Sequence, residues 1–325
     1  MKVLFIGGTG IISSAVSELA LKQGIDLYHF NRGMSFRKID GVKNIRGDIR
    51  NPKEAKEILS SYNFDVVVDW IAFTPEHVKL DVEIFRDRVK QYIFISSASA
   101  YQKPVEKLPI TENTPLSNPY WQYSRDKIAC ENLLFEEYRK NGFPVTIVRP
   151  SHTYDKTLIP VDWGYTTLYR MKKGKKTIIH GDGTSLWVLT HHKDFATGFC
   201  GLLGNEKAIG EAFHITGDEL LTWNKIYQLM ARELKVELDS IHIPSDLIAK
   251  FDPRMGASLL GDKAWSVIFD NTKIKKFVPE FKQTILFEEG VKEIIDFYET
   301  HPEFQKVDEG LDRLIDEIVE RYSKI

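Results

Sequence analysis

The chain has little cysteine and no long apolar run, and these absences exclude several classes of protein. Only Cys130 and Cys200 are cysteines among 325 residues, too few for a disulfide framework or a four-cysteine zinc site. No apolar stretch is long enough for a membrane-spanning helix, and the run at the start of the chain is too short for the core of a secretory signal. We therefore expect a protein of the reducing cytoplasm that has no membrane partner.

An excess of charge of either sign is also absent. Lys and Arg number 44 against 46 Asp and Glu, which leaves a formal net charge of -2. No global field therefore draws the molecule to nucleic acid, and nucleic acid is not an expected partner. The 42% hydrophobic and 28% charged fractions are those of an ordinary folded protein.

The first 150 residues alternate short β-rich apolar runs with helical patterns, which is the spacing of βαβ units. Val3 to Ile6 is apolar throughout, as in a strand buried on both faces. Apolar residues at helical spacing follow from Ile12 to Ala20. The pattern predicts an α/β fold, a Rossmann doubly wound parallel sheet whose ligand crevice lies at the carboxyl ends of its strands. Six strands are expected, near residues 3–6, 25–30, 42–45, 64–69, 91–95 and 145–148.

This regularity ends after Arg149-Pro150. We expect a Rossmann domain over residues 1–155, with return segments near 180–217, and a smaller interleaved C-terminal substrate domain with the C-terminal helices over 156–325. The last stretch is amphipathic. Packing on its own chain is expected, and a homodimer contact is the alternative. The apolar face consists of Leu311, Leu314, Ile315, Ile318, Val319 and Tyr322.

A glycine-rich turn, Gly7-Gly8-Thr9-Gly10-Ile11-Ile12, lies between the first strand and the first helix. Glycine permits the tight turn and lets backbone N–H groups approach a pyrophosphate, while the helix N-terminus adds partial positive charge. In this context the turn predicts a dinucleotide site. Ser13 stands where a third glycine is usual, a position that serves the packing of the helix on the strand.

The second strand ends in Asn31-Arg32, about 20 residues after the turn, where an acidic residue would hold the ribose 2′-hydroxyl of NAD. No acid is present there. Asn31 removes a charge that would repel a 2′-phosphate, and Arg32 can pair with that phosphate. The cofactor is therefore expected to be NAD(P), with a preference for NADP; an exposed arginine in a turn is the alternative interpretation of Arg32.

Tyr123 and Lys127 are four residues apart at the start of a helical pattern, so their side chains share a face. A neighbouring ammonium stabilises a phenolate, and we expect Lys127 to lower the pKa of Tyr123. Ser96 and Ser97 follow the fifth strand, which places their hydroxyls at the carboxyl end of the sheet.

With these residues the chain resembles the extended branch of the short-chain dehydrogenase/reductase superfamily, the NAD(P)-dependent epimerases and dehydratases. Four signatures occur in order: Gly7-x-x-Gly10, Ser96-Ser97, the series Pro119, Tyr123, Lys127 and Glu131, and Arg149-Pro150. The resemblance implies that Ser97 bonds the substrate oxygen, that Tyr123 transfers the proton and that Lys127 holds Tyr123 and the nicotinamide ribose.

It also implies that Asp48-Ile49 flank the adenine and that Pro150, Ser151 and His152 line the nicotinamide end. The expected cofactor contacts are Gly7, Thr9, Gly10, Ile11, Ile12, Asn31, Arg32, Asp48, Ile49, Ser96, Tyr123, Lys127, Pro150 and His152.

One feature departs from this pattern, and two further groups of residues bear on it. Trp187 occupies the position that resembles the phosphate-binding arginine of nucleotide-sugar enzymes, which weakens the case for a diphosphate substrate. His191 and His192 are adjacent on an expected strand and should point to opposite faces, so no metal site is predicted. The resemblance also suggests that Asp194 lies at the start of a short helix, where an N-cap role is natural.

The function expected is hydride transfer by an epimerase, dehydratase or reductase on a small polar, sugar-like substrate, with Tyr123 as acid and base. The alternative is an RNA- or nucleotide-binding module without turnover, because the segments around Asn31 and Asp69 also resemble an atypical subgroup that includes chloroplast stem-loop RNA-binding proteins. Two basic runs, residues 171–176 and 273–276, bear on that alternative, although such runs are usually solvated.

Overall fold

The computed structural model describes residues 1–324 and contains one large parallel sheet. The strand order is β11-β6-β5-β4-β1-β2-β3, and every neighbouring pair is parallel. This confirms the doubly wound fold, with seven strands instead of six, because the short strand near residue 213 joins the sheet beside β6. The strands are β1 (Lys2–Ile6), β2 (Asp26–Asn31), β3 (Lys43–Arg46), β4 (Val66–Asp69), β5 (Gln91–Ile95), β6 (Val145–Pro150) and β11 (Ala212–Ile215).

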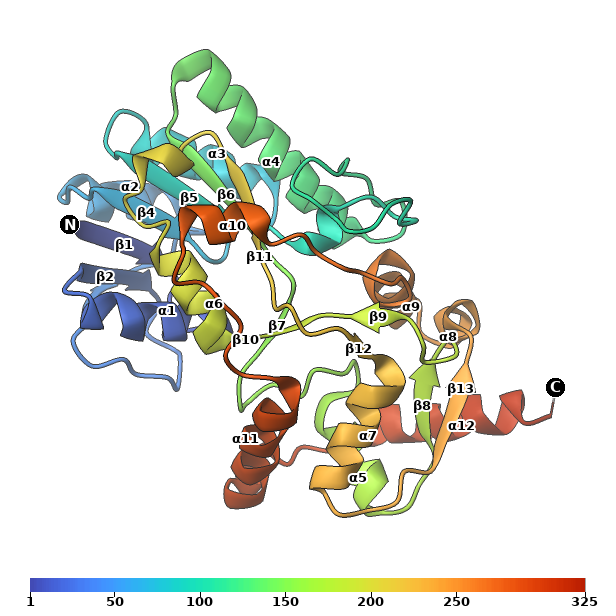
Figure 1. Cartoon of the computed structure of the whole chain (residues 1–325). Coiled ribbons are helices and arrows are strands. Elements are labelled where there is room, and N and C mark those ends of the chain that lie inside the picture. The colour runs from blue at the N-terminus through green and yellow to red at the C-terminus, as the bar shows by residue number, and fades with distance from the viewer. Residues whose placement is uncertain (325) are drawn as a thin grey trace.

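Helices cover both faces of this sheet (Figure 1). Because side chains alternate along a strand, Val3 and Phe5 of β1 pack on one face and Leu4 and Ile6 on the other. The first face is covered by α1 (Ile11–Lys22), α6 (His192–Cys200) and α10 (Thr272–Phe277). The second is covered by α2 (Pro52–Ser60), α3 (Pro75–Phe85) and α4 (Gln122–Asn141). The carboxyl ends of parallel strands lie at one edge of the sheet. The helix α1, which follows β1, and the helix α4, which comes after β5, both begin near that edge.

Most of the remaining chain packs around two further apolar clusters. Three two-stranded sheets pair β7 (His152–Tyr154) with β10 (Leu189–His191), β9 (Leu186–Trp187) with β12 (Leu221–Thr222), and β8 (Thr177–His180) with β13 (Ser240–Ile243). The helices are α5 (Gly164–Lys172), α7 (Trp223–Glu233), α8 (Ser245–Phe251), α9 (Pro253–Ser258), α11 (Phe287–Thr300) and α12 (Glu309–Tyr322). Short turns of 3₁₀ helix occur at Ala98–Ala100, Glu206–Ala208 and Pro302–Phe304, and a π-helical turn at Leu259–Lys263. The domain boundary near residue 155 stays a prediction.

The C-terminal helix α12 packs on its own chain, as expected. Ile315 and Ile318 are buried against Ile178 and Ile243. Arg170 of α5, 1% exposed at its side chain, pairs with Asp312 and Asp316 of α12. The apolar face that offered a dimer contact is thus largely used within the chain. Within residues 1–324, no helix combines the length and the apolar character needed to cross a bilayer.

Candidate active site

The glycine-rich turn after β1 is built from two glycines with positive φ. Gly7 (φ 94°) and Gly8 (φ 93°) adopt a backbone that side-chain-bearing residues rarely adopt. A Cβ on Gly8 would lie 2.6 Å from the His29 ring. His29 is buried and bonded through Nε2 to Ser17 Oγ at 2.9 Å, and burial lowers its pKa to about 4. A neutral His29 therefore packs against the turn and leaves no room for a larger residue at position 8.

The first turn of α1 offers donors for an anion. Gly10 N–H donates to Ser13 Oγ at 2.8 Å, so Ser13 closes the turn locally as well as packing the helix. The N–H groups of Ile11 and Ile12 lie in the first turn and have no carbonyl one turn earlier in the helix. These donors and the helix dipole suit a pyrophosphate.

A groove extends from this turn across the ends of β2 and β3. Arg32 is exposed, and Asn31 Oδ1 accepts from Gly33 N at 2.8 Å. Asp48 Oδ1 accepts from Arg50 N at 2.9 Å, so both polar side chains have fixed orientations. The lining includes Gly7, Thr9, Asn31, Arg32, Asp48, Ile49 and Phe73. The glycine-rich turn, the N-terminus of α1 and this groove together fit a dinucleotide.

A second cavity brings Ser97 and Tyr123 together with Pro150, Ser151 and His152. Ser97 follows β5, Tyr123 lies in the first turn of α4, and His152 begins β7. Phe73 of the groove lies 6.5 Å from Tyr123 between ring centroids, so the groove and the cavity adjoin. Residues predicted for the reaction and for the nicotinamide end therefore meet at one place.

Tyr123 differs from expectation in its acidity. Burial raises its pKa to about 12, and the Ser97 hydroxyl acts in the opposite direction. The sequence predicted that Lys127 would lower this pKa, and that prediction is wrong, because desolvation of the phenolate dominates and the charge of Asp262 adds to it. Tyr123 is therefore protonated at neutral pH and suited to donate a proton.

Lys127 is 2% exposed and lies beneath Tyr123. Its Nζ donates to Ala72 O at 2.6 Å and Ile95 O at 2.7 Å, and lies 5.7 Å from the centroid of the Tyr123 ring. Burial lowers the pKa of Lys127 to about 8. Two carbonyls thus hold the ammonium in place, and its third donor position remains for another acceptor.

His152 and Trp187 form a fixed wall of the cavity. Trp187 Nε1 donates to His152 Nδ1 at 3.0 Å, and burial lowers the pKa of His152 to about 3. The imidazole is therefore neutral with its remaining proton on Nε2. Trp187 is 3% exposed and packs on Trp223 at 5.2 Å, so it acts as a core residue as well as a cavity wall.

The Ser96 side chain is bonded within the chain. Its hydroxyl donates to Glu131, which also forms a buried ion pair with Arg149 at 2.6 Å. It lines neither the groove nor the cavity. Its side chain therefore points at Glu131 of α4, and a cofactor contact of Ser96 stays a prediction.

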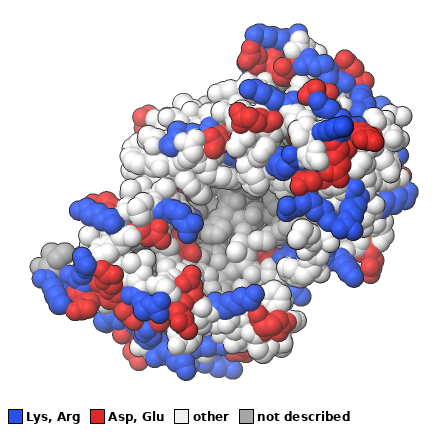
Figure 2. Space-filling model, turned by 180° about the vertical axis from the view of Figure 1, so that it is seen from behind, with Lys and Arg blue, Asp and Glu red and all other residues white. Residues whose placement is uncertain are grey.

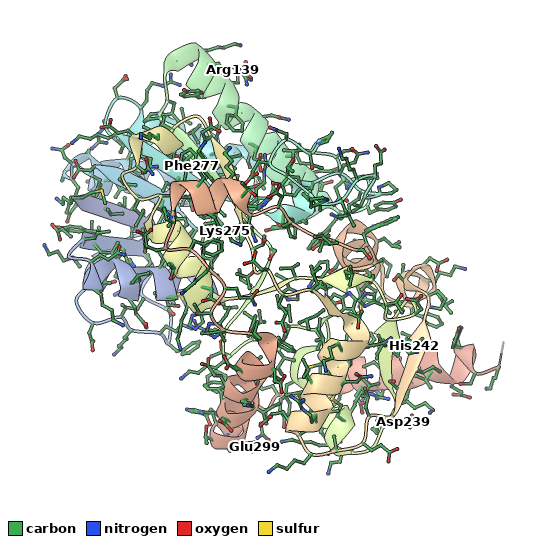
Figure 3. All side chains as sticks on the ribbon, in the orientation of Figure 1. Arg139, Asp239, His242, Lys275, Phe277 and Glu299 are labelled. Atoms are coloured by element: carbon green, nitrogen blue, oxygen red, sulfur yellow. The ribbon has the colours of Figure 1, made fainter. Side chains whose placement is uncertain are left out.

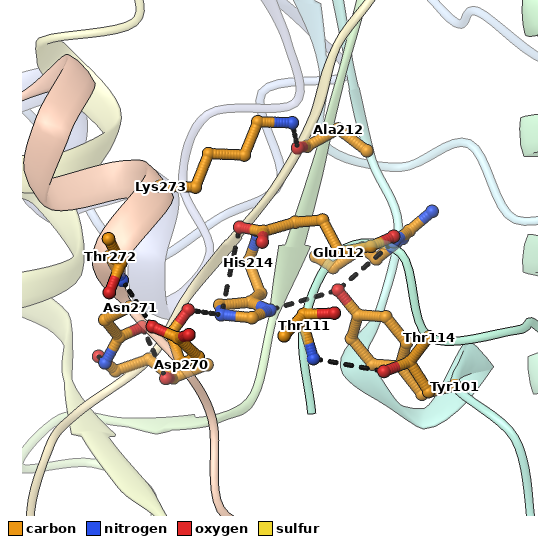
Figure 4. Close-up of polar contacts among 12 residues, drawn as sticks. Tyr101, Thr111, Glu112, Thr114, Ala212, His214, Asp270, Asn271, Thr272 and Lys273 are labelled. Atoms are coloured by element: carbon orange, nitrogen blue, oxygen red, sulfur yellow. Dashed lines mark hydrogen bonds and ion pairs between the residues drawn. The ribbon is translucent and has the colours of Figure 1, made fainter. Parts of the chain in front are cut away.

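This buried network continues from β6 to β11. Arg149 donates to Tyr101 OH at 3.1 Å, and Tyr101 OH lies 3.0 Å from His214 Nδ1. His214 Nε2 then lies 2.9 Å from Asp270 O. Figure 4 draws His214 between Tyr101 and Asp270. Burial lowers the pKa of His214, so the imidazole is neutral and donates to the carbonyl.

The two adjacent histidines do not point to opposite faces, because His191 ends β10 and His192 begins α6. Their rings lie 4.6 Å apart, and ligand atoms of both lie within 4.8 Å of Glu293. His191 Nδ1 accepts from Lys193 N at 3.4 Å, so Nε2 carries the proton that faces Glu293 Oε2 at 3.1 Å. Both ring nitrogens of His191 are therefore engaged in hydrogen bonds. The absence of a metal site stays a prediction, and it now rests on these bonds instead of on side chains that point to opposite faces.

Asp194 does not cap α6, contrary to expectation. His191 is the N-cap. Asp194 is 3% exposed and accepts from Thr284 N at 3.1 Å, Thr284 Oγ1 at 2.5 Å and Ile285 N at 3.0 Å. Its carboxylate points away from the start of α6 and holds the segment that precedes α11.

The two basic runs are largely neutralised by acids of the same chain. Lys175 pairs with Asp312, and Lys176 pairs with Asp239, which Figure 3 labels. Lys275 of α10, also labelled there, lies 2.9 Å from Asp218. Figure 2 shows both signs of charge interspersed on the opposite face around a central hollow, without a continuous basic stripe.

Sequence reasoning missed Asp262 and Lys263, which line the same cavity as Tyr123. They come from the π-helical turn at Leu259–Lys263, far along the chain. No motif or spacing marked them, and only folding brings them to the site.

Comparison with curated proteins gives three informative relatives. The chain is 30% identical over 247 residues to chloroplast stem-loop binding protein of 41 kDa b of Arabidopsis thaliana, covering 71% of this chain and 62% of that protein. It is 21% identical to 2′-dehydrokanamycin reductase of Streptomyces kanamyceticus, covering 87% and 80%. It is 34% identical over 173 residues to UDP-glucose 4-epimerase of Lactobacillus helveticus, covering 46% and 51%.

Solved structures share the whole fold. The dTDP-glucose 4,6-dehydratase of Bacillus anthracis in complex with NAD has a TM-score of 0.73 at 19% identity, with 93% of this chain and 98% of that chain covered. The UDP-glucuronic acid 4-epimerase of Bacillus cereus, in complex with UDP-glucuronic acid and NAD, has a TM-score of 0.75 at 18% identity, with 92% and 99% covered. The family model for the NAD dependent epimerase/dehydratase family matches residues 3–216. The chain therefore belongs to the NAD-dependent epimerase/dehydratase family.

Proposed function

We propose that this protein transfers hydride between a nicotinamide cofactor and a carbinol or carbonyl carbon of a small polar, sugar-like substrate, as an epimerase, dehydratase or reductase. The observation that carries the proposal is the meeting of Ser97, Tyr123 and His152 in one cavity that adjoins the groove of the glycine turn. When bound, the cofactor accepts or supplies hydride at C4 of its nicotinamide. The relatives 2′-dehydrokanamycin reductase and UDP-glucose 4-epimerase are named for sugar-containing substrates, which supports a sugar-like substrate here.

Tyr123 moves the proton. In the reducing direction, its hydroxyl donates a proton to the carbonyl oxygen as the carbon gains hydride, and the C=O bond becomes C–O–H. The phenolate left behind is stabilised by the Lys127 ammonium and regains a proton from solvent. The reverse sequence removes the proton from a carbinol, since the two directions share one transition state.

Ser97 and the buried surroundings stabilise charge on the reacting oxygen. Ser97 Oγ lies 2.9 Å from Ser99 Oγ, and Ser124 Oγ donates to Ser99 Oγ at 2.8 Å. This chain of hydroxyls fixes the orientation of Ser97, so that its proton can point at the substrate oxygen. Ser99 acts as a positioning residue for Ser97.

The proton-transfer role is tested by Tyr123→Phe. We expect turnover to fall by about 10² to 10⁴-fold, the usual contribution of a general acid, with NADPH affinity unchanged. The measurement is the nicotinamide absorbance of protein saturated with NADPH in the presence of a panel of sugar aldehydes and ketones. Equal rates in the variant and the natural chain would exclude the proton-transfer role of Tyr123.

A preference for NADP is part of the proposal. Arg32 is exposed at the groove, and no carboxylate follows β2 directly. Replacing Arg32 with Ala should weaken NADP binding about fivefold to tenfold, as expected for a partly solvated charge-assisted bond, and leave NAD binding unchanged. Arg46→Ala, at an exposed position that ends β3, is the matched control. Equal losses for both nucleotides would remove Arg32 from the choice between them.

The binding-module alternative has a distinct signature. If it holds, the protein binds RNA with a steep salt dependence and does not bind either dinucleotide. The nucleotide released when purified protein is denatured is the most direct observation, because an epimerase or dehydratase regenerates its cofactor and a simple reductase releases it.

The free, buried Cys130 and Cys200 support a reducing cytoplasm as the proposed location.

A further inference from the structure

The π-helical turn at Leu259–Lys263 is fixed firmly against the cavity. Lys263 O accepts from His180 Nε2 and from Trp223 Nε1, each at 3.1 Å. Gly261 O accepts from Asn118 Nδ2 at 2.7 Å, and the same amide donates to Ser99 O at 2.9 Å. The turn is therefore joined to the segment that carries the catalytic serine, and π turns of this kind often occur at functional sites.

Asp262 is the acidic group of this turn that faces the reacting centre. Its carboxylate lines the cavity with Tyr123, and its charge contributes to the raised pKa of that tyrosine. The side chain is 19% exposed, and its ion-pair partner, Lys103 Nζ, lies 3.7 Å away, beyond a good hydrogen bond. The carboxylate thus retains acceptor capacity toward the cavity.

The lysine beside it is engaged elsewhere. Lys263 Nζ donates to Ser258 Oγ at 2.6 Å and lies 3.2 Å from Asp162 Oδ1. The lining of this cavity, as described within residues 1–324, contains no arginine. A diphosphate would therefore meet the Asp262 carboxylate without a free cation to offset the repulsion.

The cavity is also small. Its volume of about 230 Å³ lies below the roughly 300 to 1,000 Å³ of sites that enclose drug-sized ligands. A single ring fits that space better than a nucleoside diphosphate joined to a sugar. Trp121 and Trp187 supply apolar walls on which the face of a sugar ring can pack.

We propose that Asp262 binds a hydrogen-bond donor, a hydroxyl or an ammonium, on the ring of an unphosphorylated monosaccharide whose neighbouring carbon reacts at Tyr123. The proposal rests on the proposed function, which it narrows from a sugar-like substrate to one class. Asp262 is then a substrate-contacting residue that sets specificity. Burial raises its pKa, so the carboxylate gains from any donor that replaces its lost solvent.

The test uses full-length protein saturated with NADP and follows tryptophan fluorescence, since Trp121 and Trp187 line the cavity. The probes are D-glucose, D-glucosamine and UDP-glucose. We expect at least one monosaccharide to bind saturably and UDP-glucose to bind more weakly than it. Asp262→Ala should weaken the binding of that sugar at least about tenfold, the loss of one charge-assisted bond.

The variant Asp262→Asn separates the two donors. It should weaken glucosamine strongly if an ammonium is bound, and weaken glucose only slightly if a hydroxyl is bound, because the amide oxygen still accepts from a hydroxyl. Asp246→Asn, an exposed aspartate in the first turn of α8, is the matched control and should change nothing. The affinity for NADP should be the same in all variants.

Three results would overturn the assignment: tighter binding of UDP-glucose than of either monosaccharide, no saturable binding of either monosaccharide, or unchanged sugar affinity in Asp262→Ala. A purely structural role would lower stability and NADP affinity without a selective loss of sugar. If NADP fails to bind while the sugar still binds through Asp262, the proposed redox function fails and the sugar site stands.

Discussion

Gly8 shows how one residue links sequence to site. A side chain there would be strained at φ 93° and would meet the His29 ring at 2.6 Å. Gly24 has a similar φ of 76° with nothing within 4 Å of its Cβ position. Alanine variants at Gly8 and at Gly24 therefore separate the effect of backbone strain from the effect of a steric clash under the glycine-rich turn.

Replacing Gly8 with Ala should reduce NADP affinity at least about tenfold and destabilise the fold by roughly 2 to 4 kcal/mol, because strain and clash add. Gly24→Ala should cost only about 1 kcal/mol, from strain alone, with affinity unchanged. Nucleotide titration and urea unfolding measure both effects. Equal affinity of the two variants for NADP would contradict the role given to the glycine turn.

Lys127 gives a pH dependence of stability. Its pKa is about 8 in the folded chain against an ordinary value of 10.5, so between these values the unfolded chain binds more protons than the folded one. The free energy of unfolding should therefore rise with pH across that window, by up to about 1.36 kcal/mol per pH unit from this group.

The comparison is with Lys127→Met, which has no group to titrate at that position. The stability of the natural chain should improve relative to the variant as pH rises from about 8 toward 10.5. Urea unfolding at a series of pH values measures the difference. A difference that stays constant with pH would show that Lys127 is not depressed in the folded state.

At the scale of elements, helix α6 joins the large sheet to the segment before α11. Asp194 accepts bonds from the N–H groups of Thr284 and Ile285 and from the Thr284 hydroxyl. The family resemblance placed Asp194 at a helix start, where aspartate is a common N-cap, and a cap was expected. That expectation was wrong, because the carboxylate accepts from a residue 90 positions away in the sequence.

Asp194→Ala should destabilise the protein by about 2 to 4 kcal/mol, because it leaves two N–H groups without acceptors. Thr284→Val removes only the hydroxyl and should cost about 1 kcal/mol. Hydrogen exchange should accelerate first over residues 284–300, since that segment loses its attachment. Uniform exchange across the chain would argue against a local anchor.

At the scale of the whole molecule, a buried polar network joins segments that are distant in sequence. Glu131 of α4 pairs with Arg149 of β6, whose side chains are 1% and 4% exposed. Through Tyr101 and His214 the network reaches β11 and the segment before α10. It therefore couples the middle of α4 to β11, the strand at the edge of the sheet.

Glu131→Leu should destabilise the fold by about 3 to 5 kcal/mol, because it leaves the Arg149 charge buried without its partner. The double variant Glu131→Leu with Arg149→Met should recover most of that loss, since both charges are then absent. Global unfolding by urea measures each variant. Additive losses in the double variant would show that the pair is not the source of the effect.

The sequence by itself determined the sheet, the glycine turn and the shared helix face of Tyr123 and Lys127, because periodic burial and short-range spacing are local properties of the chain. The place of Ser97 beside them came from the family resemblance. Only the tertiary structure decided the acidity of Tyr123, the partner of Ser96 and the presence of Asp262 in the cavity. Desolvation and contacts between distant segments produce these features, and neither is encoded in the spacing of neighbouring residues.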